Sequence, residues 1–159
     1  CEMNLIANNK NSTLTVLLNG KNVTVRIREP RVTDGVKFVA RLRHVREEMV
    51  PKQRLLARGR NVVLEGRDIG TVVFPNADKK FYLDASLDAR ASRRYKDFID
   101  SGHNIPVDSL KNDIRSRDES DMKREIGPLK KADDAYYIDT TKMSIQEVFN
   151  KMLKLIKDG

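Results

Sequence analysis

Residues 61–75, with the sequence NVVLEGRDIGTVVFP, are the stretch from which the fold of this chain is best interpreted. The stretch contains two short apolar runs, residues 62–64 and 71–74, and β-branched runs of this length predict buried strands. Between them lies a charged turn, residues 65–70, that contains Gly66 and Gly70. Loops that follow parallel strands in α/β proteins carry ligands. The turn is therefore either part of a ligand site or a hairpin turn with solvated charges.

This stretch belongs to a series of short motifs that runs in order along nearly the whole chain. Besides GRDIGTVVFP at residues 66–75, the series comprises LNG (18–20), VT (23–24), VRE (45–47), AD (77–78), FYLDAS (81–86), RRY (93–95), RD (117–118), Asp121, Arg124, PL (128–129) and IDTT (138–141). The series resembles the cytidylate kinase family of bacterial type. The resemblance implies an α/β fold with a P-loop-kinase-like, three-layer core around a parallel sheet, a small antiparallel lobe that binds the monophosphate, and a helical lid.

The resemblance also implies a division of the chain. Residues 1–60 correspond to the monophosphate-binding lobe, residues 61–90 and 125–159 to the core sheet, and residues 91–124 to the lid. The family's first strand and its phosphate loop, of the type GxxGxGKST, have no counterpart in this sequence. We expect a fragment of a cytidylate kinase, one chain of a split kinase whose partner chain supplies the loop, or a substrate-binding half retained as a binding module, in that order. Without the first strand, the strands expected at residues 62–64 and 81–83 lose a shared neighbour.

The composition narrows the class of protein. The 159 residues are 39% hydrophobic and 34% charged, which is typical of one domain with a core and a charged surface. No apolar run is long enough to span a membrane, and no Cys/His cluster suggests a zinc site. The single cysteine cannot form an internal disulfide, so we expect a reducing, cytoplasmic setting. The net charge of +8 predicts an anionic partner. Low aromatic content and the lack of a Lys/Arg block argue against nucleic acid.

Periodicity and turn signals predict strands that alternate with helices, which is typical of a parallel α/β sheet. Strands are expected at residues 13–18, 22–27, 62–64, 81–83 and 136–138, the first two joined by the turn Asn19-Gly20, with loop at residues 1–13. Helices are expected at residues 30–58, from Ser86 to the break at Ser101-Gly102, at residues 108–123, and after the capping box Ser144–Glu147. Pro51 is expected to kink or break the first helix. The last helix is expected to bury Ile145, Val148, Phe149, Met152 and Ile156.

Three charged residues are candidates for a phosphate site. Arg117, Asp121 and Arg124 are spaced by four and three residues, which places them on one face of a helix. Two guanidiniums beside a carboxylate can bind a phosphate and a hydroxyl group, because the planar guanidinium pairs with phosphate oxygens in a bidentate way. An intrahelical ladder of ion pairs is the alternative, and without the family resemblance it would be the favoured one.

A second pair of cations, Arg93 and Arg94, lies on the preceding predicted helix. These arginines are either solvated or part of a lid that closes on phosphates, since phosphoryl transfer needs positive charge around the transferred group. Arg93, Arg94, Arg117 and Arg124 are therefore the candidate catalytic residues.

The remaining candidates concern recognition of a base. Arg46 and Asp68 match a cytosine edge, because a carboxylate accepts from the exocyclic amine and an arginine donates to the ring acceptors. Arg46 alone would rather be interpreted as a helix-surface residue paired with a nearby Glu. The resemblance implies these base-reading roles, sugar hydroxyls on Asp121, and phosphates on Arg67, Arg117 and Arg124. Lys37 is also a candidate substrate-binding residue. Relatives usually carry at this position a serine that contributes to cytosine recognition, so this chain has a cation in place of a hydroxyl group.

These features predict a cytidylate kinase that transfers a phosphoryl group from ATP, with Mg²⁺, to CMP or dCMP and gives CDP or dCDP. ATP and Mg²⁺ would be held mainly by the segment that this sequence lacks, and no metal ligand is expected in this chain. The alternatives are a non-catalytic nucleotide-binding module and half of a split kinase. A basic nucleic-acid-binding protein is a weaker alternative that rests on charge alone.

Overall fold

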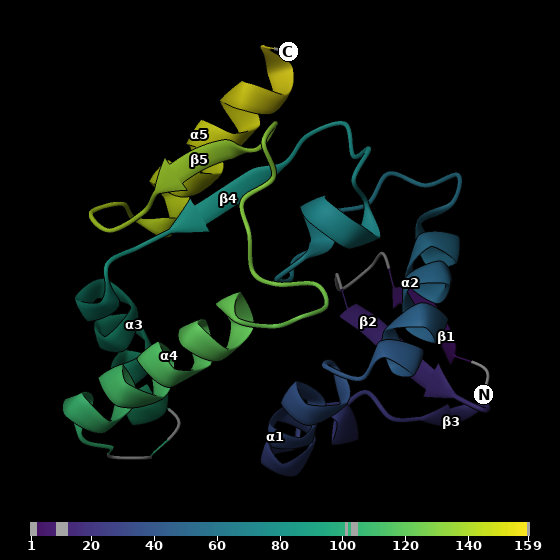
Figure 1. The fold of residues 1–159 in the computed structure, drawn as a ribbon, viewed down its shortest axis with the longest axis horizontal. Helices are drawn as coiled ribbons and strands as arrows, with labels where there is room; N and C mark the ends of the chain where they lie inside the picture. The colour runs from purple at the N-terminus through teal and green to yellow at the C-terminus, as the bar shows by residue number, and fades with distance from the viewer. Residues whose placement is uncertain (1–2, 9–12, 101, 103–104, 159) are drawn as a thin grey trace. The chain divides into compact units, whose positions relative to one another are not determined.

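The structure is a computed structural model that describes residues 3–8, 13–100, 102 and 105–158 (Figure 1). The chain divides into two compact units, Cys1–Met49 and Val50–Gly159, and the boundary falls inside helix α2 (Arg43–Ala57). Within the described ranges, every helix is too short or too polar to cross a membrane.

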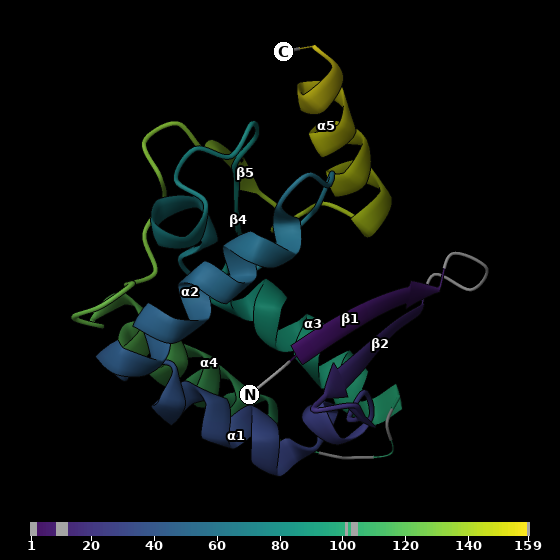
Figure 2. The same ribbon diagram turned by 90° about the vertical axis from the view of Figure 1, so that its right-hand side faces the viewer.

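The first unit contains a three-stranded antiparallel sheet in the order β1 (Met3–Asn8), β2 (Thr13–Leu18), β3 (Lys21–Asn22). Met3 lies opposite Leu18 and Asn8 opposite Thr13, so β1 and β2 pair along their full lengths, as Figure 2 shows. Asn19 and Gly20 form the turn between β2 and β3 with φ of 48° and 77°. The hairpin predicted at this turn is therefore confirmed, because both residue types tolerate positive φ.

Two predictions for this unit were wrong. Residues 3–8 form a strand instead of a loop, because their backbone pairs with the outer edge of β2. The return strand ends at Asn22 and does not continue to residue 27, where a 3₁₀ helix, η1 (Arg26–Arg28), follows instead. The Val16 N–H donates to the Thr24 hydroxyl at 2.9 Å, so a side chain replaces the next backbone acceptor of the ladder. Val25, expected on the buried face, is 78% exposed.

The helical segment predicted at residues 30–58 consists of α1 (Pro30–Val39) and α2. Pro30 occupies the first turn of α1, where its missing N–H costs nothing. The break between the helices falls at residues 40–42 and not at Pro51, which lies inside α2. A proline in the interior removes one helical hydrogen bond, and the helix continues through this exposed position. Gly59, with φ of 67°, follows the end of α2 as predicted.

The second unit contains a parallel pair of strands, β4 (Phe81–Asp84) and β5 (Tyr136–Asp139), with Phe81 opposite Tyr136 and Asp84 opposite Asp139. The pairing stacks Phe81 on Tyr136 and Tyr82 on Tyr137, with ring centroids 5.8 and 6.1 Å apart. Ile138 on β5 is fully buried. The α/β class, with parallel strands joined through helices, is confirmed.

The strands predicted on both sides of the charged turn were wrong. Residues 62–64 form no strand, and Val63 is 97% exposed. A strand needs a neighbour for its N–H and C=O groups, and among the described residues this segment has none. Residues 69–73 instead form a π-helical turn, η2 (Ile69–Val73), in which the Asp68 carbonyl accepts from the N–H groups of Val72 and Val73 at 2.9 and 3.2 Å. The apolar run is thus buried through Val73 alone.

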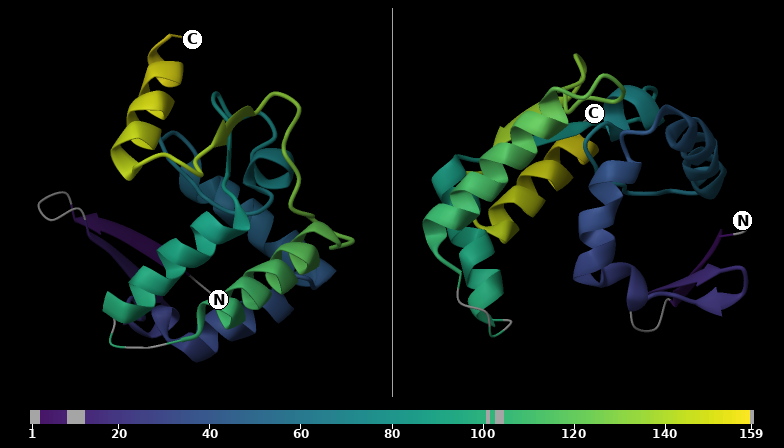
Figure 3. Two further views of the ribbon diagram at one scale, coloured as in Figure 1. Left: turned by 90° about the vertical axis from the view of Figure 1, so that its left-hand side faces the viewer. Right: turned by 60° about the horizontal axis from the view of Figure 1, so that its bottom comes forward.

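Helices α3 (Leu87–Asp100) and α4 (Val107–Met122) lie side by side, as Figure 3 shows. Ala91 of α3 and Leu110 of α4 are buried. The Ser86 hydroxyl accepts from the Ala89 N–H at 3.2 Å, so the predicted cap is confirmed.

The last helix, α5 (Ile145–Lys157), begins with the predicted capping box between Ser144 and Glu147. Its apolar face is not buried as predicted. Ile145 is 91% exposed and Phe149 and Ile156 are also exposed, whereas Val148 and Met152 are half-buried. Helical periodicity predicts which side chains share a face, but burial also needs an element that covers the face, and the described part of the unit supplies none for Ile145.

Candidate functional site

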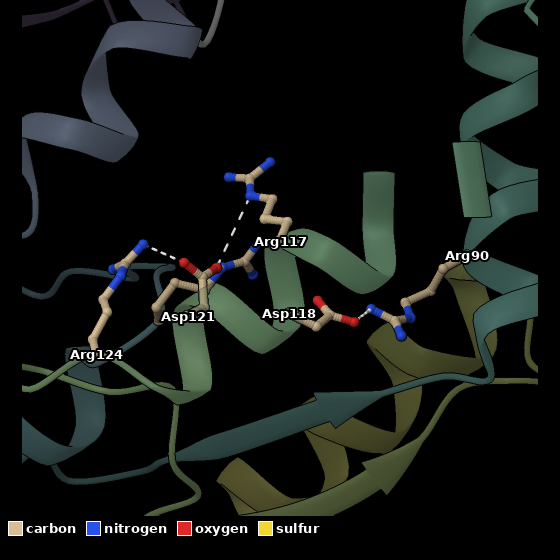
Figure 4. A network of polar contacts seen from close by, with 6 residues as sticks. Arg90, Arg117, Asp118, Asp121 and Arg124 are labelled. Atoms are coloured by element: carbon tan, nitrogen blue, oxygen red, sulfur yellow. Dashed lines mark hydrogen bonds and ion pairs between the residues drawn. The ribbon is translucent and has the colours of Figure 1, made fainter. Parts of the chain in front are cut away.

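Asp121 is the centre of a cluster of charges in the second unit (Figure 4). Its side chain is 3% exposed, although it lies in the last turn of α4. The Arg67 Nε donates to Asp121 Oδ2 at 2.9 Å, Arg124 Nη2 donates to Oδ1, and the Arg117 Nε lies 4.0 Å from Oδ2. The structure therefore brings together four of the residues that the sequence singled out, and we call Arg67, Arg117, Asp121 and Arg124 the Asp121 cluster.

Local and long-range contacts both position this cluster. Arg117 and Asp121 are one turn apart on α4, and Arg124 follows Lys123, the residue that caps the C-terminal end of that helix. Arg67 arrives from the charged turn, 54 residues earlier in the chain. The backbone is held as well, because the Leu129 N–H donates to the Asp121 carbonyl at 2.9 Å. A buried carboxylate is tolerated only when it is paired, and here it faces three guanidiniums.

The cluster has donors left over for an anion. Three guanidiniums against one buried carboxylate leave an excess of positive charge, and the Arg67 and Arg117 side chains that carry part of it are 42% and 52% exposed. Arg124 is only 10% exposed, and its buried Nε has no hydrogen-bond acceptor in the described part of the chain. Arg117 lies beyond hydrogen-bond distance of Asp121 and is half exposed, so its guanidinium can turn to a ligand. This arrangement can hold a phosphate through charge-assisted hydrogen bonds.

Asp68 follows Arg67 and is buried. Its carbonyl accepts the first hydrogen bonds of η2, and a larger residue in place of either neighbouring glycine would crowd a packed side chain. A Cβ on Gly66 would lie 2.7 Å from Ile69 Cγ1, and a Cβ on Gly70 would lie 3.3 Å from Lys80 Cδ. The charged turn is therefore packed tightly and is not a solvated hairpin.

The other predicted base readers belong to the first unit. Arg46 lies on α2, and its Nη1 donates to the Ala40 carbonyl at a long 3.5 Å. Lys37 lies in α1, and its side chain is outside the described part of the structure. Joint recognition of a base by Arg46, Asp68 and Lys37 stays a prediction.

The contacts of Arg93 and Arg94 lie away from Asp121. Arg93 donates to the Thr140 carbonyl at 2.5 Å and to its hydroxyl at 3.2 Å, and so ties α3 to the end of β5. The Arg94 guanidinium lies over the ring of Phe98, 5.4 Å from the centroid. Their predicted action on phosphates stays a prediction.

Arg90 is a residue that sequence reasoning missed. Its Nη1 lies 2.5 Å from Asp118 Oδ2, and its Nε donates to the Ala85 carbonyl at 3.1 Å (Figure 4). The pair links α3 to α4 one turn before Asp121. Lys111 and Asp88 make a second link, 2.6 Å long, whose hydrogen bond lowers the pKa of Asp88. The sequence shows that charges alternate on both helices. It does not show which of these charges form ion pairs with each other.

Polar groups also gather at the carboxyl ends of β4 and β5, the edge at which parallel sheets bind ligands. The Tyr137 hydroxyl donates to Asp84 Oδ2 at 2.9 Å, and this hydrogen bond raises the pKa of Tyr137. The Thr141 N–H donates to Asp139 Oδ1 at 2.8 Å, and hydrogen bonds from Thr141 lower the pKa of Asp139. These carboxylates serve the structure of the strand ends.

Among the described residues, no group of three or more His, Cys, Asp or Glu side chains is placed to hold a metal ion.

Comparison with known proteins gives a consistent result. The family model for cytidylate kinase matches residues 2–158. Curated relatives include the cytidylate kinases of Geobacillus sp. (strain WCH70), 47% identical over 143 residues, and of Bacillus cereus (strain B4264), 46% identical over 145 residues. These alignments cover 90% and 91% of this chain but 64% of each relative. The cytidylate kinase of Lactobacillus johnsonii is 46% identical, and 62% of it is covered. The chain thus spans less than two thirds of these relatives.

Proposed function

The chain belongs to the cytidylate kinase family, and on that basis we propose that the protein transfers a phosphoryl group from ATP to CMP or dCMP. This chain binds the monophosphate, and the Asp121 cluster is the centre of that site. The observation that carries the proposal is the excess of guanidiniums around one buried carboxylate, with Arg124 Nε lacking an acceptor among the described residues.

Each member of the cluster has a chemical role in this proposal. Asp121 accepts hydrogen bonds from the sugar hydroxyls, because a carboxylate is an acceptor only. Arg67, Arg117 and Arg124 donate to the phosphate, and Arg124 offers its unpartnered Nε. Asp68 accepts from the cytosine amine, Arg46 donates to the ring acceptors, and Lys37 lies near the base. Residues 1–60 then form the monophosphate-binding lobe, residues 91–124 the lid, and residues 61–90 with 125–159 the core.

The reaction requires little covalent help from the protein. An oxygen of the CMP phosphate attacks the γ-phosphorus of ATP, the bond from that phosphorus to the bridging oxygen breaks, and CDP and ADP result. Charge spreads over the transferred group, so arginines that surround it stabilise the transition state. Arg117 and Arg124 hold the acceptor phosphate, and Arg93 and Arg94 contribute from the lid. Mg²⁺ bound with ATP would neutralise part of the phosphate charge.

A nucleotide-binding module without catalysis is the second candidate. It is favoured by the sequence itself, which contains no GxxGxGKST loop. A partner chain that supplies this loop would restore the first candidate.

Calorimetric titration of the chain with CMP tests the binding site. Arg117→Met is expected to weaken CMP binding by about tenfold, since a lost charge-assisted hydrogen bond costs about 1.5–3 kcal/mol. Arg115→Met is the matched control, because Arg115 lies on the same helix, is exposed and contacts Asn112 instead. Equal effects of the two substitutions, or no heat with CMP, would contradict the proposed site.

Turnover separates the two candidates. Wild-type chain, together with a segment that supplies a GxxGxGKST loop, is incubated with ATP, Mg²⁺ and CMP, and CDP is measured. CDP formation that Arg117→Met reduces and Arg115→Met does not reduce supports the kinase. CMP binding without CDP supports the binding module.

A further inference from the structure

We propose that Arg54 is a positioning residue that holds the charged turn in its binding conformation, an inference that rests on the proposed function. Arg54 lies on α2, in the second unit. Its Nε donates to the Val73 carbonyl at 2.7 Å and its Nη2 donates to the Val72 carbonyl at 2.9 Å. One guanidinium thus binds two successive carbonyls of η2.

A short π-helical turn needs such a partner. Inside η2, the Phe74 N–H donates to the Ile69 carbonyl at 2.7 Å, and the Asp68 carbonyl accepts two N–H groups. The last carbonyls of any helix receive no hydrogen bond from an N–H group of the same helix. A π-helical turn is also a rare conformation. Arg54 supplies two donors and a positive charge at the C-terminal end, where the helix dipole favours a cation.

The N-terminal end of the same turn carries the site. Asp68 is the residue that precedes η2, and Arg67 before it donates to Asp121. Three residues therefore lie between Asp68 and Val72, the first residue whose carbonyl is bound by Arg54. Arg54 itself makes its hydrogen bonds to η2, so any effect on the ligand is transmitted through the turn.

Lys80 holds η2 from another direction. Its aliphatic chain contacts Gly70, and its Nζ donates to the Pro75 carbonyl and to both oxygens of Asp134. The turn remains attached on this side when Arg54 is replaced. Loss of Arg54 is therefore expected to loosen residues 72–74 and to leave the unit folded.

The test uses the full chain with Arg54→Met and Arg54→Lys. Arg54→Met is expected to weaken CMP binding by about tenfold, because two hydrogen bonds to η2 are lost. Arg54→Lys is expected to lie between this variant and wild type, since an ammonium lacks the planar fork that spans two carbonyls. Arg58→Met is the matched control, an exposed arginine just beyond the end of α2 that lines the same surface depression as Arg54.

Two further measurements distinguish positioning from a general loss of structure. Hydrogen exchange of the Val72, Val73 and Phe74 amides is expected to accelerate in Arg54→Met while that of Ile138 stays unchanged. In an Arg67→Met background, Arg54→Met is expected to weaken CMP binding by a smaller factor than in wild type, because the two act through one turn. Unchanged exchange at residues 72–74, equally fast exchange at Ile138, or fully additive losses would overturn the positioning role.

The outcome for Arg54 is separable from the outcome for the proposed function. If the wild-type chain binds no CMP, the proposed function fails. The exchange of the η2 amides is measured without nucleotide, and it still decides whether Arg54 holds the turn.

Discussion

Lys80 and Asp134 show how one buried cation makes the second unit sensitive to pH. The Lys80 side chain is 7% exposed, and its Nζ lies 2.9 and 2.7 Å from the two oxygens of Asp134. The hydrogen bond from Lys80 holds the pKa of Asp134 below its ordinary value. A carboxyl whose pKa is lower in the folded chain stabilises the fold above its unfolded pKa, about 3.9, and this contribution is lost as the pH falls through the folded pKa.

Asp134→Asn is therefore expected to lower the Tm at pH 7, because Lys80 then lacks its anionic partner. The difference from wild type is expected to shrink as the pH falls below about 4, where the wild-type carboxyl becomes protonated. Thermal unfolding between pH 7 and pH 3 measures both effects. Asp133→Asn, at an exposed neighbouring position, is the control. A difference in Tm that stays constant over this range would contradict the coupling.

At the scale of elements, the ends of helices are explained by capping residues close by in the sequence. Helix interiors and strands are not always explained by local sequence preferences. Ser144 and Glu147 satisfy each other's backbone N–H groups, and these hydrogen bonds lower the pKa of Glu147. Pro51, in contrast, lies in the middle of α2 and is exposed. The helix bears the cost of one absent hydrogen bond and continues to Ala57, two residues before Gly59.

Pro51→Ala is expected to stabilise the chain, because alanine restores the helical N–H and has the highest helix propensity. The expected gain in the free energy of unfolding is at most about 3 kcal/mol, measured by urea denaturation. Pro106→Ala is the control of the same residue type, since Pro106 precedes the first residue of α4 and its N–H is not needed there. An equal gain from both substitutions would contradict the role of the missing helical N–H at Pro51, because Pro106 lies outside the helix interior.

At the scale of the whole molecule, the net charge of +8 arises from 31 Lys and Arg against 23 Asp and Glu, and in the Asp121 cluster three arginines surround one buried carboxylate. A basic protein attracts nucleotides and nucleic acids alike. The two kinds of ligand differ in how strongly salt weakens their binding, because nucleic acid releases a counterion for each phosphate contacted.

Binding of CMP and of a single-stranded RNA oligomer is therefore expected to differ between 50 and 200 mM salt. CMP, which carries one phosphate, is expected to lose affinity only a few-fold, whereas a single-stranded oligomer held by 6–10 phosphate contacts would lose affinity about 10²–10⁴-fold. Titration of both ligands at each salt concentration checks this. Absence of CMP binding together with steeply salt-dependent RNA binding would support the nucleic-acid-binding alternative instead.

The sequence by itself determined the features that depend on neighbouring residues. Backbone φ preferences explain the turn at Asn19-Gly20, and hydrogen bonds between residues three apart explain the caps at Ser86 and Ser144. The helical repeat places Arg117 and Asp121 on one face. The motif series also determined the family, because it extends over most of the chain. These are local properties, and they are the same in any tertiary environment.

Only the tertiary structure decided which distant groups meet. The contact of Arg67 with Asp121 spans 54 residues, and the pairing of Arg90 with Asp118 and the two hydrogen bonds of Arg54 to η2 join separate elements. The same holds for residues 62–64, which have strand-like composition but no described backbone neighbour, and for Ile145, which has the right periodicity but no covering element. Strand pairing, burial and ion pairing each join two groups. A local sequence pattern identifies one of these groups but does not show which distant group it will meet.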